Sequence, residues 1–199
     1  MTQPLFAIED GEHSEVTAGG STLMTSRDLG EISERKFELR ASELGWLVAS
    51  PRGTNRDFDA IVMRRGGRPI VVQIKRSNVV QGADSKSYAI NCSRRTLKSG
   101  TCKNVLYDEN AFDVLAAHLP DIDKWMFFTR SELGSRQKTT YCPPDFRQNK
   151  RKTHYGTHGE LMSDRNPDNW ELLDQVAAMH SQESAGVSQQ MSHPILNTP

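Results

Sequence analysis

Apolar residues recur with helical spacing near the start of the chain and predict a helix over about residues 29–44. One stripe at positions i, i+4 and i+7 consists of Phe37, Ala41 and Leu44. Asp28 and Glu31 have the spacing of a capping box, and Gly45 can adopt the left-handed conformation that ends a helix. The pattern therefore predicts an amphipathic helix with one face against a core.

Short apolar segments follow this helix and predict strands that are separated by turn residues. The predicted strands cover residues 46–50, 58–63, 69–75, 87–92 and 125–129. Between the second and third of them, Gly66 and Gly67 have the chemistry of a hairpin turn. These two strands are therefore expected to pair directly.

Two more helices are predicted farther along. The second covers residues 108–119, on the spacing i, i+3, i+4 and i+7 of Phe112, Leu115, Ala116 and Leu119. The last begins at Asn166 and Pro167, residue types that favour a helix start. Helices and strands in this order predict an α/β fold, with a mixed sheet flanked by helices.

The two ends of the 199-residue chain lack such patterns. Residues 1–24 form an acidic leader that we expect to be disordered, and residues 181–199 form a Ser-, Gln- and Pro-containing tail with the same expectation. One domain is predicted over residues 25–180, with its core at 29–130. No apolar run approaches the ~18 residues of a membrane helix and no signal peptide is visible, which predicts a cytoplasmic protein without a membrane partner.

The charges cancel over the whole chain, with 25 Lys and Arg against 25 Asp and Glu, but they are unevenly distributed. Residues 64–103 contain ten Lys or Arg and one Asp, and residues 136–152 contain six Lys or Arg and one Asp. Such segments predict a surface that binds the phosphates of DNA, although a solvated basic loop is the alternative. The candidate nucleic-acid-binding residues are Arg52, Arg76, Lys86, Arg94, Arg95 and Lys98.

The cysteine and histidine residues give weaker evidence for a metal site or for nucleic-acid contacts. The three cysteines (Cys92, Cys102 and Cys142) form no CxxC pair, which argues against a disulfide framework or a zinc ribbon. A composite metal site of a cysteine with His154 or His158 is a minor alternative. His154, Tyr155 and His158 are also candidates for nucleic-acid contacts in the basic stretch over about 135–165.

Four side chains form the constellation with the strongest chemical signal: Glu34, Asp59, Gln73 and Lys75. Asp59 and Gln73 lie on strands joined by the hairpin, so they can be neighbours across the pair. Gln73 and Lys75 point to one face because side chains alternate along a strand. Glu34 lies at the edge of the helix stripe. Two carboxylates and an amide oxygen are hard ligands that suit Mg²⁺, and a lysine beside them suits phosphodiester hydrolysis.

These segments resemble the core of the PD-(D/E)XK nuclease superfamily. The resemblance lies in Phe58-Asp59, the Gly-rich turn, Gln73-Ile74-Lys75 and the preceding helix with Glu34. Gln73 stands where most members have Glu or Asp, as in a branch that includes group I intron homing endonucleases and resembles Holliday-junction resolvases. The resemblance implies a restriction-endonuclease-like fold, Asp59 and Gln73 as metal ligands, Lys75 as the catalytic lysine and Glu34 as the helix-borne acid.

By this resemblance the protein would be a Mg²⁺-dependent DNA endonuclease, with Mn²⁺ as a substitute, acting as a homodimer on duplex or branched DNA. Several alternatives stay open. Asp57 is a rival to Asp59, and each of the four side chains has an ordinary structural role as its alternative. Because an amide carries no charge, Gln73 also allows a nuclease-like module that binds DNA without cutting it. A protein whose basic loops bind an acidic partner is the third interpretation.

Overall fold

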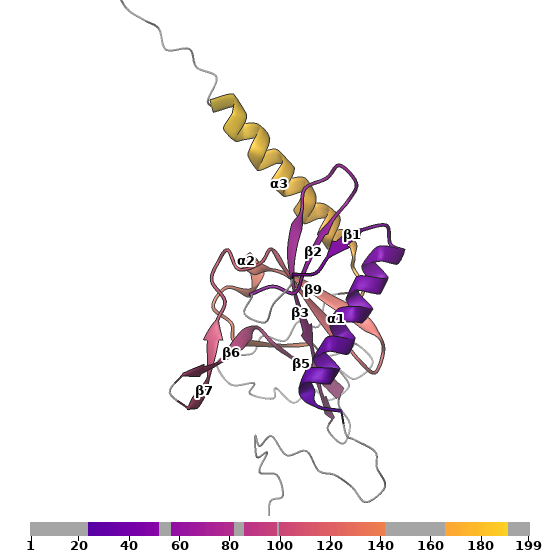
Figure 1. The fold of residues 1–199 in the computed structure, drawn as a ribbon, viewed down its shortest axis with the longest axis vertical. Helices are drawn as coiled ribbons and strands as arrows, with labels where there is room; N and C mark the ends of the chain where they lie inside the picture. Colours follow the sequence, from indigo (N-terminus) through magenta and orange to yellow (C-terminus); the bar gives the residue numbers. More distant parts are fainter. Residues whose placement is uncertain (1–23, 52–56, 82–85, 99, 142–165, 191–199) are drawn as a thin grey trace, which may run out of the picture.

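A five-stranded sheet in the order β1-β2-β3-β8-β9 forms the centre of the computed structural model (Figure 1), which describes residues 24–51, 57–81, 86–98, 100–141 and 166–190. Three-stranded (β10-β5-β4) and two-stranded (β6-β7) sheets accompany it. The elements are α1 (Ser26–Glu43), β1 (Leu47–Ala49), β2 (Ala60–Met63), β3 (Ile70–Arg76), β4 (Asn78–Gln81), β5 (Lys86–Asn91), β6 (Ser93–Lys98), β7 (Thr101–Leu106), β8 (Val114–Leu119), β9 (Lys124–Thr129), α2 (Arg130–Leu133), β10 (Lys138–Tyr141) and α3 (Glu171–Gln190).

Helix α1 confirms the predicted amphipathic helix, with a different cap. Its capping box consists of Thr25 and Asp28: the Thr25 hydroxyl accepts from the Asp28 N–H at 3.2 Å, and the Asp28 carboxylate accepts from the Thr25 N–H at 2.8 Å. The expected pair Asp28 and Glu31 was wrong by one turn, and the helix therefore begins earlier than predicted. Gly45 follows with a φ of 82°, the left-handed conformation expected of it.

Strand register places the residues of the site. In the antiparallel β2–β3 hairpin, Ala60 lies opposite Val72, and Gly66 in the turn has a φ of 76°. Strand β3 pairs with β8 in parallel, and β8 pairs with β9 in antiparallel, so the sheet is mixed. The predicted α/β fold with a mixed sheet and flanking helices is confirmed.

The helix predicted over residues 108–119 was wrong, because residues 114–119 form strand β8. All six residues of β8 are buried, so the strand is covered on both faces and has no polar alternation. A continuous apolar run of this length satisfies helical spacing by chance as well as it satisfies a central strand. Asp113, just before β8, accepts a hydrogen bond from the Val71 N–H at 2.7 Å and fixes the parallel register.

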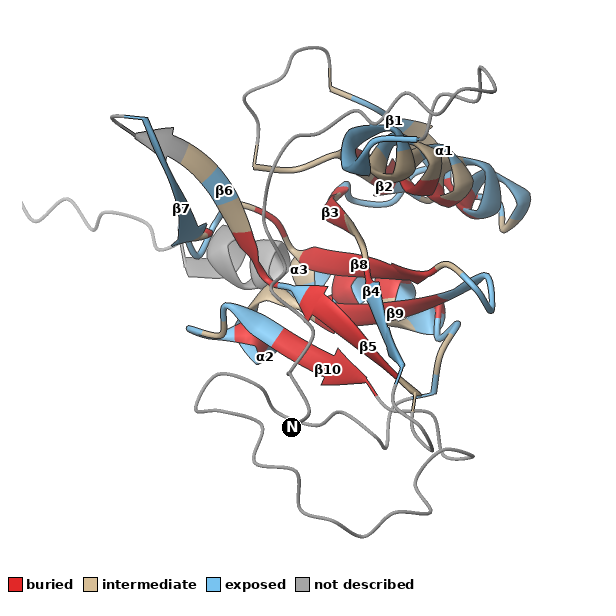
Figure 2. Cartoon of the chain, turned by 90° about the horizontal axis from the view of Figure 1, so that it is seen from below, coloured by how far each residue is buried: buried red, intermediate tan, exposed pale blue. Residues whose placement is uncertain are grey.

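Two smaller sheets lie outside the central one (Figure 2). Strand β5 corresponds to the strand predicted over 87–92, but it pairs with β4 and β10 instead of joining the main sheet. Strand β10 lies within the stretch that was interpreted as a basic loop. Its two central residues, Thr139 and Thr140, are buried against β5, and residues 142–165 lie outside the described ones.

Helix α3 closes the core on the sheet and extends beyond it (Figure 1). It begins at Glu171, later than predicted, because Asp168 has a φ of 65° and exchanges two hydrogen bonds with the backbone of Trp125 instead. The helix continues to Gln190, within the segment expected to be a disordered tail, so that boundary was wrong. Among the described residues, no helix has the length and apolar character needed to cross a membrane.

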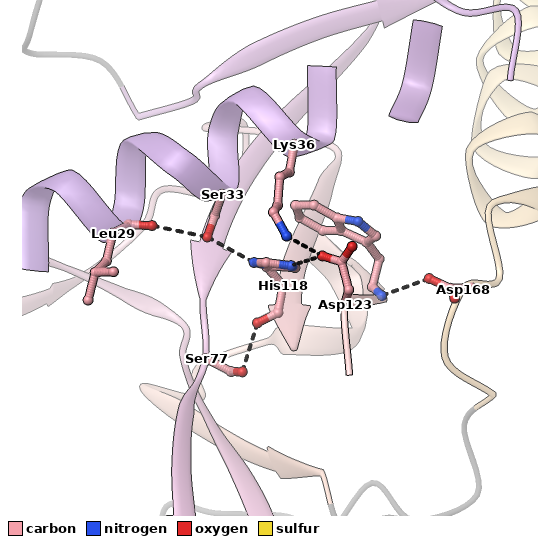
Figure 3. Close-up of polar contacts among 8 residues, drawn as sticks. Leu29, Ser33, Lys36, Ser77, His118, Asp123 and Asp168 are labelled. Atoms are coloured by element: carbon pink, nitrogen blue, oxygen red, sulfur yellow. Dashed lines mark hydrogen bonds and ion pairs between the residues drawn. The ribbon is translucent and has the colours of Figure 1, made fainter. Parts of the chain in front are cut away.

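A polar network that is buried at Ser33 and His118 and reaches solvent at Lys36 and Asp123 fastens α1 to the sheet (Figure 3). The ring of His118 on β8 lies 3.0 Å from the Ser33 hydroxyl through Nδ1 and 3.0 Å from Asp123 through Nε2. Lys36 donates to the same Asp123 carboxylate at 2.6 Å. Burial lowers the pKa of His118, against the opposing effect of Asp123, and the ring stacks on Trp125. His118 is therefore a structural residue on strand β8, in the segment that was predicted to be a helix.

We expect Leu173→Ala to lower the free energy of unfolding by about 3 kcal/mol, because the side chain is fully buried where α3 packs on the central core. Chemical denaturation measures this change. Met179→Ala on the same helix is the control, since Met179 is 54% exposed and its truncation should change stability by less than about 0.5 kcal/mol. Equal effects of the two substitutions would show that α3 does not pack on the sheet.

Candidate active site

Asp59 directly precedes β2 and is held in place by hydrogen bonds to β3. Its N–H donates to the Val72 carbonyl at 2.9 Å, which continues the β2–β3 register and places Asp59 opposite Gln73. The Asp59 carboxylate accepts from the Ile74 N–H at 2.8 Å and from the side-chain amide of Gln73. The neighbours expected from the hairpin are therefore in direct contact.

Gln73 and Lys75 point to the face of β3 opposite the residues that pack against α1. Ile74, between them, belongs to the core that contains Phe37 and Ala41 of α1. Gln73 is 4% exposed, and its amide nitrogen also lies 3.2 Å from the Ile74 carbonyl oxygen. The alternation predicted for this strand places both side chains beside Asp59.

The three ionisable groups of the site influence one another's protonation. Burial and the neighbouring Asp59 charge raise the pKa of Glu34 to about 6. Burial also raises the pKa of Asp59, against the Ile74 N–H, Lys75 and Gln73, which lower it. Burial lowers the pKa of Lys75, and the two carboxylates oppose that shift. Glu34, Asp59 and Lys75 are thus coupled electrostatically, and burial shifts the pKa of each of them toward the neutral form.

Tyr107 and Cys92 line the site and were missed by sequence reasoning. The Lys75 ammonium lies 5.3 Å from the centre of the Tyr107 ring, and Tyr107 is 5% exposed. Burial raises the pKa of Tyr107, with Asp59 and Asp57 adding to the rise, and burial raises the pKa of the Cys92 thiol to about 11. Both residues flank the β6–β7 pair, so only the tertiary structure brings them to Lys75.

Asp57, the rival of Asp59, makes a separate ion pair with Arg94 of β6. The Asp57 carboxylate is therefore paired with Arg94 beside the site, whereas the Asp59 carboxylate accepts hydrogen bonds from β3. Asp57 raises the pKa of Tyr107 and Arg94 lowers it, so the pair borders the same space. The geometry favours Asp59 as the central carboxylate.

Comparison with known proteins identifies the family of the chain and supports its fold. A family model described as PD-(D/E)XK endonuclease matches residues 24–157, more than half of the chain. The chain belongs to the PD-(D/E)XK endonuclease family. Among solved structures, the bacterial homing endonuclease I-Ssp6803I is similar, with 18% sequence identity, a TM-score of 0.63 and coverage of 79% of this chain and 99% of that one. This likeness supports the restriction-endonuclease-like fold. No curated protein matches the chain.

The donor set of this PD-(D/E)XK site fits a hard divalent cation. Within the described ranges, no three His, Cys, Asp or Glu side chains are grouped to hold a metal. The candidate ligands are instead two carboxylates, of Glu34 and Asp59, together with an amide oxygen of Gln73. Burial is the main cause of the raised pKa of Glu34, and a cation would offset the repulsion by Asp59 that adds to it. A composite site with His154 or His158 involves residues outside the described ones.

The candidate nucleic-acid-binding residues are distributed over several places. Arg52 and the side chain of Lys98 lie outside what the structure describes. Arg76 ends β3 beside His118, and Lys86 makes an ion pair with Asp121. Arg94 and Arg95 are neighbours on β6 and so point to opposite faces. The structure therefore brings only part of the predicted basic set near the site.

We expect Glu34→Gln to stabilise the metal-free protein by about 1 kcal/mol at pH 7.5, a value reduced for the partial exposure of Glu34. The charged form of Glu34 is disfavoured in the folded state, because its folded pKa of about 6 exceeds the ordinary value of 4.5. Above pH 6 the charged Glu34 therefore lowers the free energy of unfolding. Well below pH 4.5 Glu34 is protonated in both the folded and the unfolded state, so the stability difference between the parent and Glu34→Gln disappears. Thermal unfolding with EDTA at both pH values measures the effect.

Glu43→Gln is the control for this prediction, because Glu43 is an exposed residue of α1 that pairs with Arg40 at the surface. Adding Mg²⁺ should raise the melting temperature of the parent more than that of Glu34→Gln. A destabilised Glu34→Gln at pH 7.5 would contradict the half-buried carboxylate with a raised pKa described above.

Proposed function

We propose that this protein is a Mg²⁺-dependent DNA endonuclease that acts as a homodimer. The observation that carries the proposal is the convergence of Asp59, Gln73 and Lys75 on one hairpin with Glu34 from α1. The family supports nuclease chemistry, and the basic segments support a polyanionic substrate. Two copies provide one site for each strand of a duplex.

Each side chain has a role that follows from its contacts. Glu34 and Asp59 supply negative charge to the cation. Gln73 uses its amide nitrogen to hold Asp59, which leaves its carbonyl oxygen as the ligand atom. The chemistry supplied by bound Mg²⁺ is activation of water and neutralisation of charge at the scissile phosphate.

Lys75 supports the reaction from the same face of β3. Its half-buried ammonium is attracted by the two carboxylates and lies 5.3 Å from the centre of the Tyr107 ring, so its orientation is restricted. It can orient the attacking water through a hydrogen bond and stabilise negative charge that develops on the phosphate. Burial lowers its pKa, which brings proton transfer closer to neutral pH than for an exposed lysine.

A DNA-binding module that does not cut is the second candidate function. Gln73 favours it, because the amide contributes no charge to the metal and already donates a hydrogen bond to Asp59. In that case the cation site would be weak and the basic surface would keep its role.

We expect the purified chain to cut supercoiled plasmid, a four-way junction or linear duplex with Mg²⁺, and to leave all three intact with EDTA. Asp59→Asn and Lys75→Ala should each lower the cleavage rate by roughly 100-fold or more, because each removes a charge next to the reacting phosphate. Gel electrophoresis with time measures the rates, and sedimentation measures whether the active species is a dimer.

Two matched controls accompany these variants. Asp57→Asn removes the rival carboxylate and should cost less than about 10-fold, because Asp57 pairs with Arg94 and not with β3. Lys124→Ala removes an exposed lysine of β9. If the parent binds duplex in a salt-dependent manner but cuts no substrate, the non-cutting module is the correct function. If the parent cuts no substrate and its binding to duplex does not depend on salt, both functions are excluded.

A further inference from the structure

The β6–β7 pair forms a ribbon that projects from the body of the protein (Figures 1 and 2). Its base lies next to the candidate site, since Arg94 pairs with Asp57 and Tyr107 lies beside Lys75. It is a separate two-stranded antiparallel sheet of six residues in each strand. The described residues of β7 from Thr101 to Val105 are all exposed. Gly100 in the turn has a φ of 76°, which allows a tight connection at the tip. Such a ribbon is about 20 Å long.

The two faces of the ribbon differ in their relation to the site. Cys92 and Tyr107, which flank the paired strands, face Lys75. Because side chains alternate along a strand, the residues at even steps from them share their face. This face is called the site-side face, and its described residues are Arg94, Thr96, Thr101, Lys103 and Val105.

The ion pair of Arg94 with Asp57 confirms this assignment at the base of the ribbon, since Asp57 borders the site. Arg95 and Asn104, which lie opposite each other in the register, belong to the other face. The site-side face is therefore a continuous extension of the wall that Cys92 and Tyr107 form beside Lys75.

The chemistry of the ribbon suits nucleic acid. Residues 93–106 contain four Lys or Arg and no Asp or Glu. On the site-side face, Lys103 is exposed and lies opposite Thr96, and Val105 is 38% exposed. Lysine and threonine can donate to base edges, and the methyl groups of threonine and valine can contact the thymine methyl.

We propose that the β6–β7 ribbon lies in the major groove of duplex DNA with its site-side face on the base edges, next to the phosphate that is cut. The major groove of B-DNA accepts a two-stranded ribbon without distortion, whereas the minor groove, about 6 Å wide, would have to be widened to hold one. This proposal rests on the proposed function, because it requires the scissile phosphate to lie at Asp59 and Lys75. It assigns Lys103 and Thr96 to sequence recognition, and Arg95 to the face turned away from the bases.

The test compares Lys103→Ala with Arg95→Ala, which remove one exposed cation each from opposite faces of the same ribbon. The full chain selects binders from a pool of randomised duplexes with EDTA present, so that cleavage does not remove them. The parent should enrich a sequence preference. Lys103→Ala should lose that preference at one or two positions and bind the selected duplex about tenfold less tightly. Arg95→Ala should keep the preference.

Methylation of guanine N7 at the preferred positions should block parent binding, because N7 lies in the major groove. The proposal is overturned if no sequence is enriched, if Lys103→Ala keeps the preference, or if both variants lose it equally. Plasmid cleavage with Mg²⁺ is measured separately. Cleavage without enrichment overturns the ribbon proposal alone, whereas enrichment that depends on Lys103 without cleavage overturns the nuclease function and leaves recognition by the ribbon in place.

Discussion

The burial of opposed charges at one point of the sheet is the constraint on which the rest of this structure depends. Glu34, Asp59 and Lys75 all lose hydration, and each of their pKa values shifts toward the neutral form because of it. Isolated buried charges would be very costly, so their cost is tolerable only when the groups face one another. The attraction of Lys75 for both carboxylates therefore requires that α1 and the hairpin hold a fixed relative position.

The polar network around His118 provides that position. Ser33, which binds the His118 ring, directly precedes Glu34 on α1. His118 lies beside Arg76 in the parallel register of β3 and β8, one position from the pair of Lys75 and Ala117. The same network thus fixes the helix that carries the acid and the strand that carries the lysine. Its buried members, Ser33 and His118, have hydrogen-bond partners, which allows them to be buried without a large penalty.

The parts of the fold that were predictable from sequence are those where local chemistry and tertiary packing agree. Phe37 and Ala41 form a stripe that contacts one core, and the glycine turn at Gly66 fixes the hairpin that brings Asp59 to Gln73. Residues 108–119 were mispredicted because a strand covered on both faces carries no alternation. Tyr107 left no local signal, since its role arises only when β7 returns it to Lys75. The basic residues were recognised as a group from the sequence, but the face of the sheet on which each side chain lies depends on strand register.

Gln73 shows how the site balances metal affinity against stability without metal. With a carboxylate at this position, a third buried acid would lie against Asp59, and one lysine would have to offset three negative charges. The amide instead donates to Asp59 and, with the Ile74 N–H, favours its charged form. This arrangement lowers the electrostatic cost of burying Asp59, because a hydrogen bond replaces a repulsion. The same change removes one charged ligand, so on the proposed function cation binding would depend on Asp59 and Glu34. Because the pKa of Glu34 is about 6, its ionisation would then couple the strength of cation binding to pH near 6.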